Sequence, residues 1–538
     1  MPILDKKGRA DIWRGEYEAG MTLAMFSMNG SLRVINHSSA AVLAFSVLLA
    51  APALGAGPAE EATRAAIARV QRIDPAINAV IALDPTAIAQ AMRIDASGLR
   101  GPLVGVPVLI KDNIEVAGPL PTTAGSLALI DNVTNRDAPL VARLRQAGAV
   151  ILGKTNLSEW ANIRSSHSIS GWSAVGGQTR NPHALDRNPC GSSSGSGAAV
   201  AAGEVDYAIG TETDGSITCP ASLNGVVGFK PTVGLVSRTH IVPISASQDT
   251  AGPITRTVHQ AAELLSVIAG SDPTDLATRH ADTHRVNFAA ALNPNSLRGA
   301  RLGVMRFAST YQLDPAFEAA LAVLKAQGAT LVEIKSFDDK AIGANEGKVL
   351  NTELKVGLNA YLATTPSSVT TRTLAQVIAF NQAHAAQEMA LFGQETFIDA
   401  QKTKGLADPA YKVARATSLA AAGVNGIDKL LAANKLDALV GPTTGPSWKI
   451  DAVNGDSFSG GGAGSLAAVA GYPHLTVPMG TVKGLPVGLS FMGAKWSDAR
   501  ILSLGYAYEQ ASHALVSPRF PRSIEETPEV APLLARQR

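Results

Sequence analysis

The sequence alternates between amphipathic helical patterns and short apolar runs that have the composition of buried strands. In "DAPLVARLRQAGAVILGKTN", residues 137–156, apolar side chains recur at helical spacing as far as Gly148, and the run "AVIL" follows directly. The same alternation returns from Leu297 onward, with long helical patterns between Asn351 and Leu431. Repeated alternation of this kind is typical of α/β proteins. We therefore predict a single α/β domain with one sheet and helices on both of its faces.

The first part of this domain is expected to contain a helix and, after it, a short buried strand. The pattern "AEEATRAAIARVQRI", residues 59–73, predicts a helix that Asp74 and Pro75 stop. The segment "PLVGVPVLIKDN" predicts a short aliphatic strand that ends in Lys111, Asp112 and Asn113. Three polar side chains therefore follow a buried strand.

The composition and the charge distribution of the chain limit the classes of binding partner that we expect. Hydrophobic residues make up 46% and charged residues 17% of the 538 residues, and dispersed charges leave a net charge of +2. No basic stripe indicates a nucleic-acid partner, and no acidic tail indicates a solvating role. We expect a small or neutral molecule as the partner and no nucleic acid.

The first part of the chain differs from the rest. The apolar run "SSAAVLAFSVLLAAPALGA", residues 38–56, follows Arg33 and ends in small residues, which is the layout of a secretory signal peptide. A buried helix of the fold is the alternative. We expect an N-terminal extension with a signal peptide over residues 1–56, a domain over residues 57–538, and an exported protein without membrane contact once the signal is removed. Translation that starts at Met28 or at another internal Met would fit this layout better than a start at Met1.

The chain has two cysteines, Cys190 and Cys219, too few for a disulfide framework. A single bridge between them is possible even so, and two unpaired, buried thiols are the preferred expectation.

Two short motifs each suggest a function that their context argues against. Residues 148–155, "GAVILGKT", match the phosphate-loop pattern, but their centre is strand-forming and no helix opens at Lys154. Residues 191–195, "GSSSG", match the nucleophile elbow of Ser-His-acid hydrolases, with Ser193 at the centre. Turn formers precede this motif instead of a strand, and none of the ten histidines stands in a context that marks a base.

A further set of candidate catalytic residues is spread over three segments of the chain. It combines Lys111 at the end of its strand, the serines Ser192 and Ser193, and Ser216 in "GTETDGSITCPAS". A serine nucleophile needs a base, and a lysine can serve when burial lowers its pKa enough to keep the amine neutral near pH 7. A lone lysine at a strand end is ordinarily a solvated charge, so only the combination favours catalysis.

These segments together resemble the amidase signature family. The resemblance is carried by "GVPVLIKDN", "GSSSGSGAAVAAG" and "GTETDGSITCPASLNGVVGFKPT", and further by "GKTNLSEWAN", "DTAGPITRTV" and "GYPHLTVPMG", from about residue 60 to residue 515. It implies a large, twisted, mixed sheet and a hydrolase. No cluster of His, Cys or acidic residues has the spacing of metal ligands, so we expect no metal, and we expect no cofactor. The resemblance also assigns "GKTN" to a strand and loop of the fold.

The resemblance implies a role for each site residue. Ser216 is the nucleophile, Ser192, which lies 24 positions earlier, is the serine that follows a cis peptide bond, and Lys111 is the base. The small residues that begin with Ser193 support this cis segment. Backbone N–H groups of four residues would hold the oxyanion: Thr213, Asp214, Gly215 and Ser216.

The chain departs from the family pattern at several positions. Many members carry Gly where this chain has Asp214 and Ser194, and members often carry Arg just after the nucleophile, where this chain has Thr218 and Cys219. A fixed cation would favour anionic acyl groups, so its absence predicts neutral ones.

Further segments, among them "PCGSSSGS", "ETDGSI" and "PISASQDTAGP", resemble the bacterial peptide amidases of this family. This implies release of ammonia from C-terminal peptide amides or from small neutral amides. The alternatives are a broad aryl or alkyl amidase, the glutamine-dependent amidase component of the transamidosome, which is cytoplasmic, and a non-enzymatic binding protein. The retained Lys111, Ser192 and Ser216 argue against the last of these.

Overall fold

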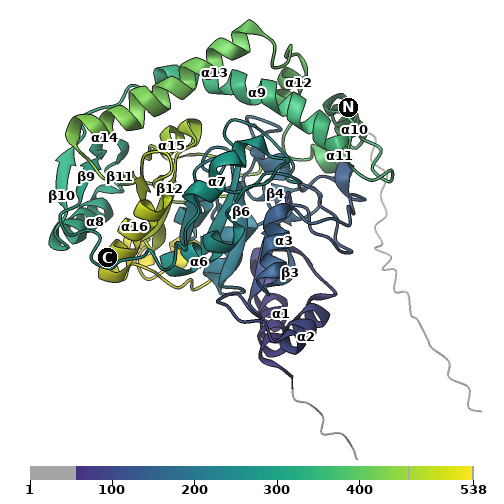
Figure 1. Cartoon of the computed structure of the whole chain (residues 1–538), viewed down its shortest axis with the longest axis horizontal. Helices are drawn as coiled ribbons and strands as arrows, with labels where there is room; N and C mark the ends of the chain where they lie inside the picture. The colour runs from purple at the N-terminus through teal and green to yellow at the C-terminus, as the bar shows by residue number, and fades with distance from the viewer. Residues whose placement is uncertain (1–55, 459, 536–538) are drawn as a thin grey trace, which may run out of the picture. The chain divides into compact units, whose positions relative to one another are not determined.

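Eleven strands hydrogen-bond into one sheet at the centre of the protein (Figure 1). In spatial order they are β1 (Val80–Leu83), β3 (Val150–Thr155), β2 (Pro107–Lys111), β6 (Tyr207–Glu212), β8 (Thr250–Thr255), β7 (Val227–Lys230), β12 (His474–Val482), β13 (Leu485–Met492), β11 (Ala438–Pro442), β9 (Arg301–Val304) and β10 (Thr330–Glu333). The computed structural model describes residues 56–458 and 460–535.

The sheet is mixed, as expected. β3, β2 and β6 run parallel to one another, and so do β11, β9 and β10. The strands between these two groups pair antiparallel, and β1 adds antiparallel to β3. A separate ribbon pairs β4 (Trp172–Ser173) with β5 (Gly177–Gln178).

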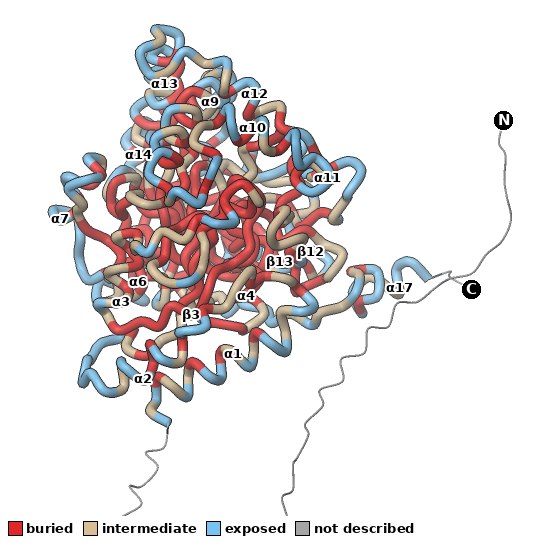
Figure 2. Tube along the Cα trace, turned by 90° about the vertical axis from the view of Figure 1, so that its right-hand side faces the viewer, coloured by how far each residue is buried: buried red, intermediate tan, exposed pale blue. Residues whose placement is uncertain are grey.

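Successive side chains of the strands point to opposite faces of the sheet, so each strand feeds two apolar layers. In β2, Val108 and Ile110 pack into one layer and Leu109 packs into the other. Figure 2 shows that the buried residues concentrate in the centre and that exposed residues lie on the outer sides of the helices.

Helices cover both faces, which confirms the predicted architecture. One apolar layer includes residues of α3 (Pro139–Gln146), α6 (Val258–Ile268), α8 (Asp314–Ala326) and α16 (Asp498–Ser512). The other includes residues of α1 (Pro58–Ile77), α2 (Ala87–Ser97), α4 (Ser194–Ala202) and α5 (Thr218–Leu223) near β2 and β3, and of α14 (Asp428–Asn434) and α15 (Ser465–Ala470) near β11.

A further helical layer arches along the top of the molecule in the view of Figure 1. It contains α9 (Lys340–Leu362), α10 (Leu374–Ala383), α11 (Ala385–Glu388), α12 (Glu395–Gln401) and α13 (Pro409–Ala422). Leu358 of α9 and Phe397 of α12 pack with Trp160, which joins this layer to the body of the protein. The remaining α-helices of the described residues are the short α7 (Ala281–His284) and α17 (Ala531–Leu534).

The N-terminal expectation lies almost entirely outside the described residues, since only Ala56 of the apolar run is described. Export and the signal peptide therefore remain predictions. Within the described part of the chain, no helix is both long enough and apolar enough to cross a membrane.

Helix α1 corrects one prediction. It continues through Asp74 and Pro75 and ends at Ile77, where Asn78 takes a left-handed conformation and its N–H bonds to the Asp74 carbonyl. The Asp74 carboxylate accepts hydrogen bonds from the N–H groups of Ala79 and Val80. Proline lacks one hydrogen-bond donor, but its fixed φ is compatible with a helix. The hydrogen bonds of Asp74 hold the turn that contains Pro75.

The phosphate-loop match is a strand, as the sequence context indicated. Residues 150–155 form β3, and all six are buried. Lys154 makes an ion pair with Asp112, with 2.8 Å between Nζ and Oδ1 and only 1% of each side chain exposed. Lys154 also donates to Thr122 Oγ1 at 2.9 Å, and Asp112 accepts from Thr123 N at 3.1 Å. This lysine therefore neutralises a buried carboxylate.

We expect Lys154→Met to lower the free energy of unfolding by about 3–5 kcal/mol, because it leaves the Asp112 carboxylate buried without its cation. Urea denaturation followed by circular dichroism measures the change. The exposed Lys335 offers a matched control, since Lys335→Met should change stability by no more than about 0.5 kcal/mol. A loss below about 1 kcal/mol in Lys154→Met would contradict a buried, charged pair.

Candidate active site

A cavity of about 950 Å³ opens beside three parts of the chain: the turn after β6, the beginning of the serine-rich segment (residues 190–196), and the first turns of α9. Thr213, Asp214, Gly215 and Ser216 form part of its wall, together with Cys190 and Gly191. The apolar part of the wall comes from segments far apart in the chain: Ile163, Ile244, Phe307, Phe337, Leu350, Phe458 and Leu466. Sequence patterns did not identify these wall residues, because only the fold brings them together.

Ser216 lies in the turn between β6 and α5, at the cavity wall. The residue is 8% exposed, and its hydroxyl makes no hydrogen bond to another described residue. Glu212 fixes the turn, since its Oε2 accepts from the N–H groups of Ile217 at 2.7 Å and Thr218 at 3.0 Å. Glu212 stood in the motif "GTETDGS" but was not singled out there.

Ser192 follows a cis peptide bond with Gly191, at the position that the family resemblance implied. Its neighbour Ser193 connects this segment to two others: the Ser193 N–H donates to the Ser216 carbonyl at 3.1 Å, and its hydroxyl donates to the Thr211 carbonyl at 3.0 Å. Helix α4 then begins at Ser194. A Cβ on Gly195 would overlap the backbone of Ala79 and Asn156, so only glycine allows this close approach.

Lys111, the last residue of β2, is completely buried. Its Nζ donates to Ser192 Oγ at 2.8 Å and to Thr211 Oγ1 at 2.8 Å. Desolvation lowers the pKa of the Lys111 amine to about 7, although the Asp249 and Glu212 carboxylates oppose the shift. Both protonation states of Lys111 are therefore populated near neutral pH.

The structure thus brings Lys111 and Ser192 into direct contact and holds the Ser216 turn beside them through Ser193. No hydrogen bond joins the hydroxyls of Ser192 and Ser216 among the described residues. Residues 213–216 line the cavity, and within the described chain none of their backbone N–H groups donates to another residue.

The nucleophile-elbow alternative has no structural support. Ser193 is buried and bonded to Thr211, and within residues 56–458 and 460–535 no histidine hydrogen-bonds to Ser192, Ser193 or Ser216. The two most buried histidines bond elsewhere: His183 Nε2 to the Asn224 carbonyl at 3.0 Å and His474 Nε2 to Ser490 Oγ at 2.6 Å.

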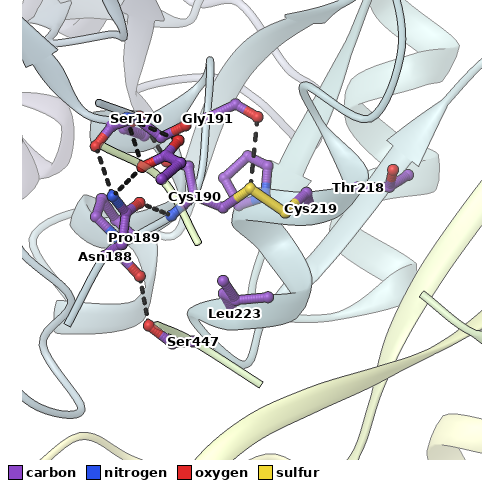
Figure 3. Close-up of a disulfide and its surroundings, with 12 residues drawn as sticks. Ser170, Asn188, Pro189, Cys190, Gly191, Thr218, Cys219, Leu223 and Ser447 are labelled. Atoms are coloured by element: carbon purple, nitrogen blue, oxygen red, sulfur yellow. Dashed lines mark hydrogen bonds between the residues drawn. A yellow bond between two sulfur atoms is a disulfide. The ribbon is translucent and has the colours of Figure 1, made fainter. Parts of the chain in front are cut away.

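The expectation of two free thiols is wrong. Cys190 and Cys219 form a disulfide with a Cα–Cα distance of 6.0 Å (Figure 3). Their separation of 29 positions in the sequence gave no sign of this proximity, which arises because the serine-rich segment packs against the turn that carries Ser216.

Carboxylates predominate among the charged residues of the cavity wall. Asp214, Asp339 and Glu346 line it, whereas Lys340 is the single cation in its described lining. Desolvation, followed by the neighbouring Glu346 carboxylate, raises the pKa of Asp214 well above its usual value. Among the described residues no group of three or more His, Cys, Asp or Glu side chains could hold a metal ion.

The sequence model of the Amidase family matches residues 61–502. The chain belongs to the amidase signature family and is an amide-hydrolysing enzyme. A protein described as a probable amidase from Arabidopsis thaliana is 40% identical, over 84% of this chain and 86% of that protein. A glutamyl-tRNA(Gln) amidotransferase subunit from Symbiobacterium thermophilum is 34% identical, over 84% of this chain and 93% of that protein.

Among solved structures, the chain is similar to those of peptide amidases. The peptide amidase from Stenotrophomonas maltophilia is 50% identical, with a TM-score of 0.81 over 86% of this chain and 95% of that one. A peptide amidase in complex with the competitive inhibitor chymostatin is 51% identical, with a TM-score of 0.82 over 86% of this chain and 96% of that one. The predicted resemblance to peptide amidases is thereby confirmed.

Proposed function

We propose that the enzyme hydrolyses carboxamides, preferentially the C-terminal amides of peptides, through a relay of Ser216, Ser192 and Lys111. The observation that carries this proposal is the 2.8 Å contact between the buried Lys111 amine and Ser192. It lies beside a cavity into which Ser216 presents an unbonded hydroxyl.

In the proposed reaction, Ser216 Oγ attacks the carbonyl carbon of the amide. Ser192 takes the proton of Ser216 and passes its own proton to the neutral Lys111 amine. The C–N bond then breaks, the protonated Lys111 returns a proton through Ser192 to the departing ammonia, and an acyl ester remains on Ser216. Water hydrolyses this ester by the same relay and releases the carboxylic acid.

The unbonded N–H groups of residues 213–216 are the proposed oxyanion donors. One well-placed donor of this kind contributes about 3 kcal/mol to the stability of the transition state. Gly215 has a positive φ of 78°, a conformation that glycine adopts without steric cost and that turns the backbone here. Glu212 and Ser193 support the site by fixing the two ends of this turn.

The volume and the lining of the cavity favour a neutral substrate that is larger than a small primary amide. Pockets for drug-sized ligands span about 300–1,000 Å³, so the cavity has room for more than a small primary amide. Its three phenylalanines suit an apolar side chain, and the carboxylates of Asp339 and Glu346 oppose an anionic acyl group. These features and the similarity to peptide amidases support a peptide amide over glutamine, the substrate class of the transamidosome alternative, and over a broad aryl or alkyl amide.

We expect Ser216→Ala, Lys111→Ala and Ser192→Ala each to lower kcat/KM on a peptide amide by at least about 10³-fold, because each breaks the relay. Ammonia release measures the rates. Ser237 is also buried and bonds to Asp272 and Thr239, which lie outside the cavity wall, so Ser237→Ala should retain turnover. Near-native turnover in Lys111→Ala would refute the lysine base, and loss of activity in His474→Asn would reopen a histidine mechanism.

The pKa of about 7 at Lys111 predicts the pH profile. The base must be neutral, so kcat/KM should fall about tenfold per pH unit below pH 7 and level off above it. Asp249 raises the pKa of Lys111, so Asp249→Asn should move the falling limb toward lower pH. A profile that is flat between pH 5 and pH 9, or a limb that Asp249→Asn moves upward, would contradict this assignment.

Substrate choice can be decided by one comparison at equal concentrations. We expect a short neutral peptide amide to exceed glutamine, malonamate and a fatty amide by at least about tenfold in kcat/KM, or about 1.4 kcal/mol. Ammonia release measures all four. A preference for malonamate would contradict the expected neutral acyl group and would point to Lys340, the cation of the described cavity lining. A preference for glutamine would favour the transamidosome alternative.

A further inference from the structure

The disulfide joins the two segments that carry the proposed relay. Cys190 lies two residues before Ser192, and Cys219 lies three residues after Ser216. Figure 3 shows the sulfur–sulfur bond between the segment around Gly191 and the helix that carries Cys219. Both cysteines also line the cavity.

Each half of the disulfide is firmly attached to its own serine segment. Cys190 has a φ of +59°, which is uncommon for a residue other than glycine. Its N–H donates to Asn188 Oδ1 at 2.8 Å, and its carbonyl accepts from Ser194 Oγ at 2.6 Å. The Cys219 N–H donates to the Gly215 carbonyl at 2.8 Å, which places Cys219 in the first turn after the nucleophile.

Hydrogen bonds and apolar packing also join these segments: the Asn224 side chain donates to the Pro189 carbonyl at 2.9 Å, and Ala198 of α4 packs in one cluster with Ala221 of α5. The disulfide is the covalent link between them. The Ser193 N–H donates to the Ser216 carbonyl at 3.1 Å, and the hydroxyls of Ser192 and Ser216 share no hydrogen bond within the described chain. Proton transfer needs those two oxygens at hydrogen-bond distance when substrate is bound, and a displacement of about 1 Å can cost about 10²-fold in rate.

We propose that Cys190 and Cys219 are positioning residues whose disulfide holds the Ser216 turn against Ser192 for proton transfer. This inference rests on the proposed relay. Its chemical consequence is that a dithiol reductant slows the enzyme: it transfers two electrons and two protons to the disulfide, becomes a cyclic disulfide itself, and leaves two thiols. Both cysteines line the cavity, so the cavity is the side from which a small reductant would approach the bond.

The test compares the oxidised enzyme, the enzyme reduced with dithiothreitol, and the double variant Cys190→Ala/Cys219→Ala. Two readouts report on the nucleophile: kcat with a peptide amide, and the rate at which a fluorophosphonate phosphonylates Ser216. In that labelling step the Ser216 Oγ–P bond forms, the P–F bond breaks, and the serine proton leaves through Ser192. We expect both rates to fall at least about tenfold while KM changes less than about threefold.

Leu223 supplies the matched control, because it packs in the same apolar cluster as both cysteines but forms no covalent link. Leu223→Val should lower Tm and leave both rates within about twofold of the wild type. Dithiothreitol should leave the double variant unaffected, and reoxidation should restore the reduced wild type.

Each outcome decides the proposal. A folded double variant with wild-type rates would overturn it, as would equal losses in Leu223→Val. If the double variant does not fold, the reduced wild type decides, with circular dichroism to verify folding and a thiol assay to verify two free thiols per chain. If the reduced protein also unfolds at the assay temperature, the bond serves global stability and the positioning role is wrong. If the oxidised wild type neither hydrolyses amides nor reacts with the fluorophosphonate, the proposed function fails instead.

Discussion

The site depends on the burial of one amine. Lys111 lies at the end of β2, fully removed from water, and its Nζ contacts two hydroxyl oxygens. In water this amine would be charged and could not accept a proton at neutral pH. Inside the protein its pKa is about 7, so the same group becomes a base. In the proposed relay, Ser192 and Ser216 can transfer their protons only because this base accepts one.

The sheet explains why the necessary groups meet. β2 and β6 are parallel neighbours, so their carboxyl ends reach the same edge of the sheet. β2 delivers Lys111 there, and β6 leads into the turn that carries Ser216. The serine-rich segment contacts the ends of both strands, since Ser192 bonds to Lys111 and Ser193 bonds to Thr211. It continues as helix α4, whose small residues allow tight packing. Ligands of α/β proteins generally bind at the carboxyl ends of strands, and this cavity follows that rule.

The sequence predicted correctly those features that depend on contiguous residues. The strand before Lys111, the strand that contains Lys154 and the covered sheet follow from apolar patterning, and the family motifs predicted the cis peptide before Ser192. It failed where long-range packing decides. The Cys190–Cys219 bond and the aromatic cavity wall depend on contacts between distant segments. The last turn of α1 was missed for a local reason, since the carbonyl and carboxylate of Asp74 accept hydrogen bonds that hold this turn. The expected roles of the site residues, and the export signal outside the described residues, remain predictions.

The neutral lysine also has a thermodynamic cost that the rest of the fold must offset. Its pKa falls from 10.5 to about 7 on folding, a shift that corresponds to on the order of 5 kcal/mol of folding free energy. The unfolded chain binds more protons than the folded chain between about pH 7 and pH 10.5, so this group makes the free energy of unfolding rise with pH across that window. At neutral pH, where the enzyme needs the free amine, nearly the whole of this cost therefore applies. The apolar layers on both faces of β2 supply the compensating stability, and they also create the dry environment that keeps the amine neutral.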